Sequence, residues 1–315
     1  MPNLTSTSNF LLQEFSEVRE LQILHFSAFL TLYSIATGGN VLIITLVILD
    51  HRLHTPMYFF LMNLALMDVG SISVIVPKSM ANSLMDSRTI SYSGCVAQVF
   101  FYVFFAGSNV ALLTIMAHDR YVAICNPLQY ETIMNKGACI QMATSAWIFG
   151  FLFGLLHTSG TFANTFCSNA VDQFFCEIPK LLRLSCSELY LIEIGFLVLG
   201  NCTGFGCFIF ITATYVSIFT AVYRIPSEQG RQKALSTCLP HLIVVSVFVF
   251  TGVFVYTSPP STTASDLDLG FAVIYAIFPP MLNPFIYSMR NKEIHTALWK
   301  IFHWRHSNRS SRLLL

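Results

Sequence analysis

The sequence predicts an all-α membrane protein, a single domain built as a bundle of seven transmembrane helices. Of its 315 residues, 54% are hydrophobic and only 10% are charged, and the mean hydropathy is +0.63, whereas a soluble domain carries about 25% charged residues. This composition excludes a soluble enzyme and a disordered chain. The net charge of only +1 argues against nucleic acid as a partner.

Seven long apolar runs separate the charged residues, and each is long enough for one helix across a bilayer core of about 30 Å. Six runs are free of charge, and the seventh, 53–77, contains only Asp68. Because a charge at the centre of a spanning helix costs about 2.5 to 3.5 kcal/mol on insertion scales, we expect one span in each run. The expected spans are 23–49, 57–79, 95–120, 139–160, 194–223, 237–258 and 269–289. Such unbroken runs exclude a membrane β-barrel, whose strands alternate over about ten residues.

The signs of the charges predict the orientation. With the tail 290–315 in the cytoplasm, 12 of the 17 Lys and Arg residues fall on the cytoplasmic side, and 10 of the 16 Asp and Glu residues fall outside. Basic residues collect on the inner side, so we expect segment 1–22 to be extracellular. Asn3 then lies in a usable glycosylation sequon. No basic region followed by an apolar core opens the chain, so the first span should act as its own insertion signal.

Apolar residues after the last span predict a short amphipathic helix on the inner leaflet, as an alternative to a frayed polar tail. They recur at helical spacing at Ile294, Ala297, Leu298, Ile301 and Phe302.

Four of the nine cysteines are expected on the outer side. Cys95 lies at the start of the third span, and Cys167, Cys176 and Cys186 lie in the long connection 161–193. An oxidising compartment favours disulfides here, and four cysteines can pair in three ways.

Motifs for catalysis or for a metal site are absent from the sequence. Histidine pairs at helical spacing, such as His51 with His54, do not complete a metal site and fit a solvated surface better. We therefore expect neither enzymatic activity nor a cofactor.

Asp68 is the one carboxylate expected deep within a span. Buried charges in membranes are expensive and usually functional. The natural partners are Asn40, Asn109 and Asn283 in the first, third and seventh spans. A structural hydrogen-bond node is the competing interpretation.

Two motifs lie at the expected inner face. Asp119, Arg120 and Tyr121 end the third span, where interfacial anchoring alone would explain them. Near the inner end of the seventh span, Pro284 follows Asn283 and precedes Tyr287. Proline removes a backbone donor, so this part of the helix is a candidate moving element.

These motifs on seven spans resemble the rhodopsin-like G-protein-coupled receptors, and longer segments are similar to the olfactory receptors. The segments are LHTPMYFFL at 53–61, MAHDRYVAICNPL at 116–128, KALSTC at 233–238 followed by His241, and PMLNPFIYSMRNKE at 280–293. They cover nearly the whole chain in order.

The resemblance implies an odorant sensor in the plasma membrane, expected in olfactory cilia, that couples to a stimulatory olfactory-type G protein and raises cyclic AMP. Its expected partners are a small odorant, the heterotrimeric G protein and membrane lipid. It also implies disulfides Cys95–Cys176 and Cys167–Cys186. Many members carry Glu where this chain has Asn109, which puts an ion site at Asp68 in doubt.

The resemblance further places the odorant among the outer halves of spans three, five, six and seven. Helical phase from Arg120 then puts three candidate ligand contacts on the inward face of the third span, with two more on the fifth and two on the sixth. They are Tyr102, Val103 and Ala106 on the third, Leu199 and Thr203 on the fifth, and Val253 and Tyr256 on the sixth. Any one of them could be plain core packing. We expect ligand binding to move the inner end of the sixth span, near His241, away from Arg120. A transporter or channel is the alternative class, but the spans show no internal duplication.

Overall fold

The computed structural model of the chain describes residues 8–85, 87–187, 189–224, 226–257, 266–289, 293, 294 and 296. Within these ranges it does not describe the side chains at 233, 237, 248–257, 266–268, 288 and 289. The expected Asn3 sequon, the side chains of Val253 and Tyr256, and most of the helix expected after the last span therefore lie outside the described residues.

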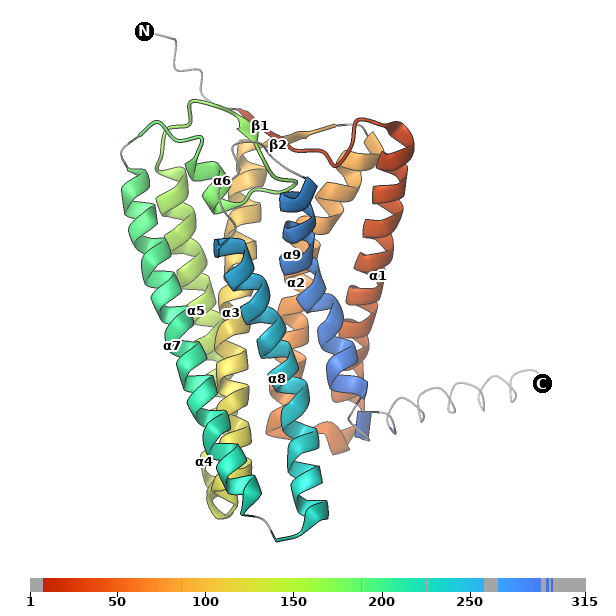
Figure 1. Cartoon of the computed structure of the whole chain (residues 1–315), viewed down its shortest axis with the longest axis vertical. Coiled ribbons are helices and arrows are strands. Elements are labelled where there is room, and N and C mark those ends of the chain that lie inside the picture. Colours follow the sequence, from red (N-terminus) through yellow and green to blue (C-terminus); the bar gives the residue numbers. More distant parts are fainter. Residues whose placement is uncertain are drawn as a thin grey trace, which may run out of the picture.

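Within the described residues, seven long helices form one up-and-down bundle (Figure 1), which confirms the predicted fold class. They are α1 (Arg19–Leu49), α2 (Pro56–Met85), α3 (Tyr92–Cys125), α5 (Lys136–Phe162), α7 (Tyr190–Tyr223), α8 (Glu228–Thr257) and α9 (Asp266–Met289). Among the described residues, all of them except α8 contain an apolar stretch long enough to cross a membrane. The shorter helical elements are η1 (His51–Leu53), η2 (Pro127–Gln129), α4 (Tyr130–Ile133) and α6 (Ile178–Leu182).

Most of the helices extend beyond the expected spans, because polar residues outside a membrane core do not stop a helix. Local caps set two of the boundaries. The Ser91 side chain accepts a hydrogen bond from the Gly94 amide at the start of α3, and Asn135 accepts one from Ala138 at the start of α5. One consequence corrects an expectation: Glu193, expected in a connection, lies in the first turn of α7 and is fully buried.

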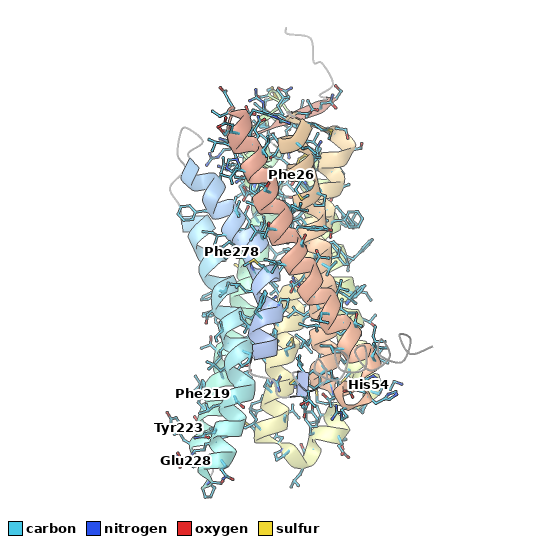
Figure 2. All side chains as sticks on the ribbon, turned by 90° about the vertical axis from the view of Figure 1, so that its right-hand side faces the viewer. Phe26, His54, Phe219, Tyr223, Glu228 and Phe278 are labelled. Carbon is cyan, nitrogen blue, oxygen red and sulfur yellow. A yellow bond between two sulfur atoms is a disulfide. The ribbon has the colours of Figure 1, made fainter. Side chains whose placement is uncertain are left out.

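A small three-stranded sheet, which the sequence did not predict, lies at one end of the bundle (Figure 1). Strand β1 (Asn9–Leu12) pairs antiparallel with β2 (Thr89–Ser91) and parallel with β3 (Ala170–Val171). Residues of β1 alternate between exposed and buried, as one covered sheet face requires. We call this end the sheet end and the other, where α4 lies, the opposite end. Figure 2 shows Phe219, Tyr223 and Glu228 near the opposite end.

Helices α3 and α5 pack closely because α5 presents glycines to α3. A Cβ atom on Gly150 would lie 2.5 Å from the backbone oxygen of Phe104, and one on Gly154 would lie 3.0 Å from that of Phe100. Only glycine permits this approach. The Gly-x-x-x-Gly pattern at 150–154 therefore serves packing within the bundle.

Candidate functional site

Asp68 of α2 is the centre of a buried polar node that joins three helices. The Asn109 side chain of α3 donates to one carboxylate oxygen at 3.1 Å, and the Asn283 side chain of α9 donates to the other at 2.7 Å. Asn40 takes a different role, since its amide donates to the backbone oxygens of Ala36 and Pro280 and so ties α1 to α9. The node thus consists of Asp68, Asn109 and Asn283, and Asn40 binds the same helix α9 next to it.

A cavity of about 310 Å³ lies within the bundle, between this node and the connection 176–179 at the sheet end. Its lining comes from α2, α3, α5, α7, α8 and α9 and from residues 176–179, and most of the lining side chains are apolar. Asp68, Asn109 and Asn283 line it. The cavity and the polar node therefore share side chains, so a molecule in the cavity contacts the node directly.

The connection between α5 and α7 covers the cavity, and we call its residues 173–179 the roof segment. Disulfide Cys95–Cys176 binds it to α3, and the Gln98 side chain accepts a hydrogen bond from the Cys176 amide at 2.8 Å. From α9, the Tyr275 hydroxyl donates to Glu177 at 2.6 Å. Burial raises the pKa of the Glu177 carboxyl, although its hydrogen bonds from Tyr275 and Gln173 oppose that shift. The roof segment is thus fastened to both α3 and α9.

The second disulfide, Cys167–Cys186, closes a loop within the same connection. Both pairs are those that the family resemblance implied. The described free cysteines lie at 125, 139, 202, 207 and 238.

The structure places the candidate ligand contacts differently on different helices. Tyr102, Val103 and Ala106 of α3 and Thr203 of α7 line the cavity. Leu199 does not: it is 59% exposed on the outside of the bundle, while Gly200 takes the lining position. Leu199 lies one residue, about 100° of helix, before that lining position.

At the opposite end, Asp119 and Arg120 are both buried. The Tyr130 hydroxyl of α4 donates to Asp119 at 2.8 Å. Burial and the nearby Asp119 charge raise the pKa of Tyr130, so its hydroxyl remains a donor at neutral pH. Tyr121, the third residue of the motif, packs beside the core at this end.

His241 of α8 links three helices close to Arg120. Its Nε2 atom lies 3.0 Å from the Leu113 backbone oxygen of α3, and its Nδ1 atom lies 2.7 Å from the Tyr215 hydroxyl of α7. A carbonyl only accepts, so Nε2 carries the hydrogen, and in the neutral ring Nδ1 accepts from Tyr215. Arg120 interacts electrostatically with Tyr215, His241 and Tyr287. Pro284 lies one turn before Tyr287 in α9.

A buried histidine–glutamate pair lies at the cavity wall, and it was not predicted from the sequence. His157 of α5 and Glu193 of α7 meet at 2.6 Å between Nδ1 and a carboxylate oxygen, with side chains 3% and 0% exposed. His157 also lines the cavity. A glutamate at the edge of an apolar run gave no signal of burial, because its partner is 36 residues away.

No group of three or more His, Cys, Asp or Glu side chains within the described residues could hold a metal ion. The polar side chains that line the cavity include those of the node, Glu177 of the roof segment and His157. The others are Ser71, Tyr102, Asn201, Thr203 and Tyr275.

Comparison with solved structures identifies the class of the fold. Squid rhodopsin superposes with a TM-score of 0.74 over 95% of this chain and 91% of its own, at 17% identity. The bundle thus has the fold of squid rhodopsin.

The sequence comparisons identify the family. The olfactory receptor family model matches residues 29–305. Human olfactory receptor 14I1 is 49% identical over 96% of this chain and 97% of its own, and human olfactory receptor 14C36 is 50% identical with the same coverage. Gorilla olfactory receptor 1G1 is 46% identical over 95% and 96%. The chain belongs to the olfactory receptor family, a family of multi-pass membrane receptors and not of enzymes.

Proposed function

We propose that this receptor binds small, mostly apolar volatile molecules in the cavity and activates a stimulatory olfactory-type G protein, which raises cyclic AMP. The observation that carries the proposal is the cavity itself, which is largely apolar, roofed and continuous with the Asp68 node. An apolar ligand gains free energy on leaving water for such a site, and a few polar groups orient it.

The orientation follows from the charge distribution. With the sheet end outside and the opposite end in the cytoplasm, the disulfides lie in the oxidising compartment and most basic residues face the cytoplasm. The cavity then opens in the outer half of the bundle. Asn3 is the expected glycosylation site, and olfactory cilia are the expected location.

Activation is a shift between two populations of the receptor, because a ligand favours a state only through its differential affinity for it. The cavity lining includes Val244 of α8, one turn from His241. Movement of α8 at the opposite end has to break the hydrogen bonds of His241 to Leu113 and Tyr215. That movement uncovers Arg120 for the G protein, with Asp119, Tyr121 and the Asn283–Pro284–Tyr287 segment around it.

The test is cyclic AMP accumulation in cells that express the receptor, screened with a chemically broad odorant panel. Two variants give the controls. Ala106→Phe fills the cavity and should abolish the response, and Arg120→Ala should abolish it without preventing ligand binding. Both should reach the cell surface. A response that survives in Ala106→Phe would contradict the cavity, and one that survives in Arg120→Ala would contradict the coupling mechanism.

A further inference from the structure

We infer that His157 is a hydrogen-bond donor to the ligand, so that the cavity selects uncharged volatiles with an acceptor oxygen, namely ketones, aldehydes and esters. The inference deepens the proposed function, on which it rests for the biological role of the cavity. Its basis is the protonation of the buried pair formed by His157 and Glu193.

The pair is isolated in an apolar setting. Glu193 is fully buried, and His157 is the one basic side chain within ion-pair distance of it among the described residues. A net charge buried without compensation is strongly unfavourable. With a neutral histidine and an ionised glutamate, the pair would carry one negative charge. It therefore holds one more proton than that form, shared between the two side chains, and is neutral overall.

Either position of that proton on the short bond gives the same result at the other ring nitrogen. If the proton is on Nδ1, the ring is an imidazolium and Nε2 also bears hydrogen. If it is on the carboxyl, Nδ1 accepts, so the neutral ring carries its hydrogen on Nε2. In both forms Nε2 is a donor.

The third neutral arrangement puts the proton on the other carboxyl oxygen, Oε2. That oxygen has no hydrogen-bond partner among the described residues, and Glu193 does not line the cavity. Its O–H would therefore stay unpaired, whereas an Nε2–H lies beside the cavity, where a ligand can accept from it. The 2.6 Å separation of Nδ1 and Oε1 also matches a charge-assisted hydrogen bond better than a neutral one. Nε2–H is therefore the favoured state.

The Nε2 atom has no partner within the described part of the chain. Buried donors are nearly always paired, so an unpaired donor beside a ligand cavity indicates a group that a ligand completes. Gly200 opens the space there: a Cβ atom at that position would lie 3.4 Å from Nε2, and both residues line the cavity.

Phe153 controls access to this donor. Its ring packs edge-on against the imidazole with centroids 4.4 Å apart, and it lines the cavity too. Because Nε2 is covered without a ligand, the phenyl ring has to turn for an acceptor to reach it. Carboxylic acids are disfavoured as ligands, because a carboxylate would bring an uncompensated charge into a largely apolar cavity.

The test measures ligand-induced thermal stabilisation of the purified full-length receptor. The probes are straight-chain methyl ketones and acetate esters, each paired with the hydrocarbon of the same skeleton. Ketones and esters should stabilise the wild type at concentrations about tenfold lower than the hydrocarbons, as one hydrogen bond to a buried donor implies.

Three variants keep the test sharp. His157→Leu combined with Glu193→Leu removes both polar groups together, so no unpaired charge prevents folding, and the preference for ketones and esters should vanish. His157→Gln retains an N–H for the ligand and should keep the preference. Thr158→Val removes a neighbouring unpaired hydroxyl that does not line the cavity and should leave the preference unchanged.

An equal effect of ketone and hydrocarbon on the wild type, or a preference that persists in the double variant, overturns the inference. Cyclic AMP, measured on the same variants in cells, separates this result from the proposed function. Ketone-selective stabilisation without any cyclic AMP response would contradict the function and support the role of His157. A cyclic AMP response that is equal for ketone and hydrocarbon would support the function and contradict the role of His157.

Discussion

The Asn283 amide of α9 donates to the Asp68 carboxylate of α2 across 2.7 Å, four residues before Tyr287 in the same helix. Asp68 binds the Asn109 amide of α3 with its other oxygen. One side chain therefore fixes the position of α9 relative to α2 and α3 at the point where three prolines, Pro279, Pro280 and Pro284, interrupt the backbone bonds of α9. The cavity reaches the same atoms, so ligand contact and helix position are linked there.

Replacing Asp68 should destabilise the receptor. In Asp68→Leu, the amides of Asn109 and Asn283 both lose their acceptor, and each buried unsatisfied group costs about 1–3 kcal/mol. Asn109→Leu loses one of the two bonds and should lose about half as much. Thermal unfolding of the detergent-solubilised receptor measures both. Equal unfolding temperatures for Asp68→Leu and the wild type would exclude the node as a structural element.

His241 should hold the receptor in its resting state. His241→Leu removes two interhelical hydrogen bonds, each worth about 1 kcal/mol, so the ratio of signalling to resting receptor should rise by roughly thirtyfold and ligand-free cyclic AMP should rise. Tyr215→Phe removes only the bond between α7 and α8 and should raise it by a smaller factor. Surface expression, measured in parallel, normalises the signal. Unchanged or lower ligand-free signalling in His241→Leu would show that these bonds also exist in the signalling state.

The sequence predicted the bundle because bilayer physics acts on the sequence directly. A charge inside a span is expensive, so Asp68 was conspicuous, and its partners Asn109 and Asn283 followed from the rarity of polar side chains nearby. The family resemblance supplied the two disulfides. These predictions of the spans, the Asp68 partners and the disulfides did not depend on the rotation of any helix about its axis.

Helix rotation was the information that the sequence lacked. The outer face of a membrane helix is as apolar as its inner face, so hydrophobic periodicity does not orient α7, and Leu199 was chosen where Gly200 lines the cavity. Glu193 was missed for another reason. It precedes the apolar run that begins at 194, so it was expected in a connection, whereas α7 begins at Tyr190 and includes it. The sheet of β1, β2 and β3 was missed because its strands are only two to four residues long.

The two disulfides should contribute unequally to stability. In the chain-entropy estimate, a loop of 81 residues is worth about 4.5 kcal/mol and one of 19 residues about 3 kcal/mol. Cys95→Ala with Cys176→Ala should therefore destabilise more than Cys167→Ala with Cys186→Ala. It should also reduce ligand response more, since Cys176 belongs to the roof segment. Thermal unfolding and dose–response curves of the two double variants test this order, and the reverse order would contradict it.

Glu177 should make attachment of the roof segment dependent on pH. Burial raises the pKa of its carboxyl above the ordinary glutamate value of 4.5, so the ionised form is less favourable in the closed roof than in an opened one. Protonation therefore stabilises closure: the stabilisation is complete below about pH 4.5 and is lost as the pH rises through the raised pKa. Amide hydrogen exchange of residues 173–179 should slow as the pH falls through this window, after correction for the intrinsic exchange rate. Glu177→Gln keeps an oxygen to accept from Tyr275 but does not titrate, so its corrected exchange should be independent of pH. A wild type that matches this variant across the window would show that the Glu177 carboxyl does not control the roof.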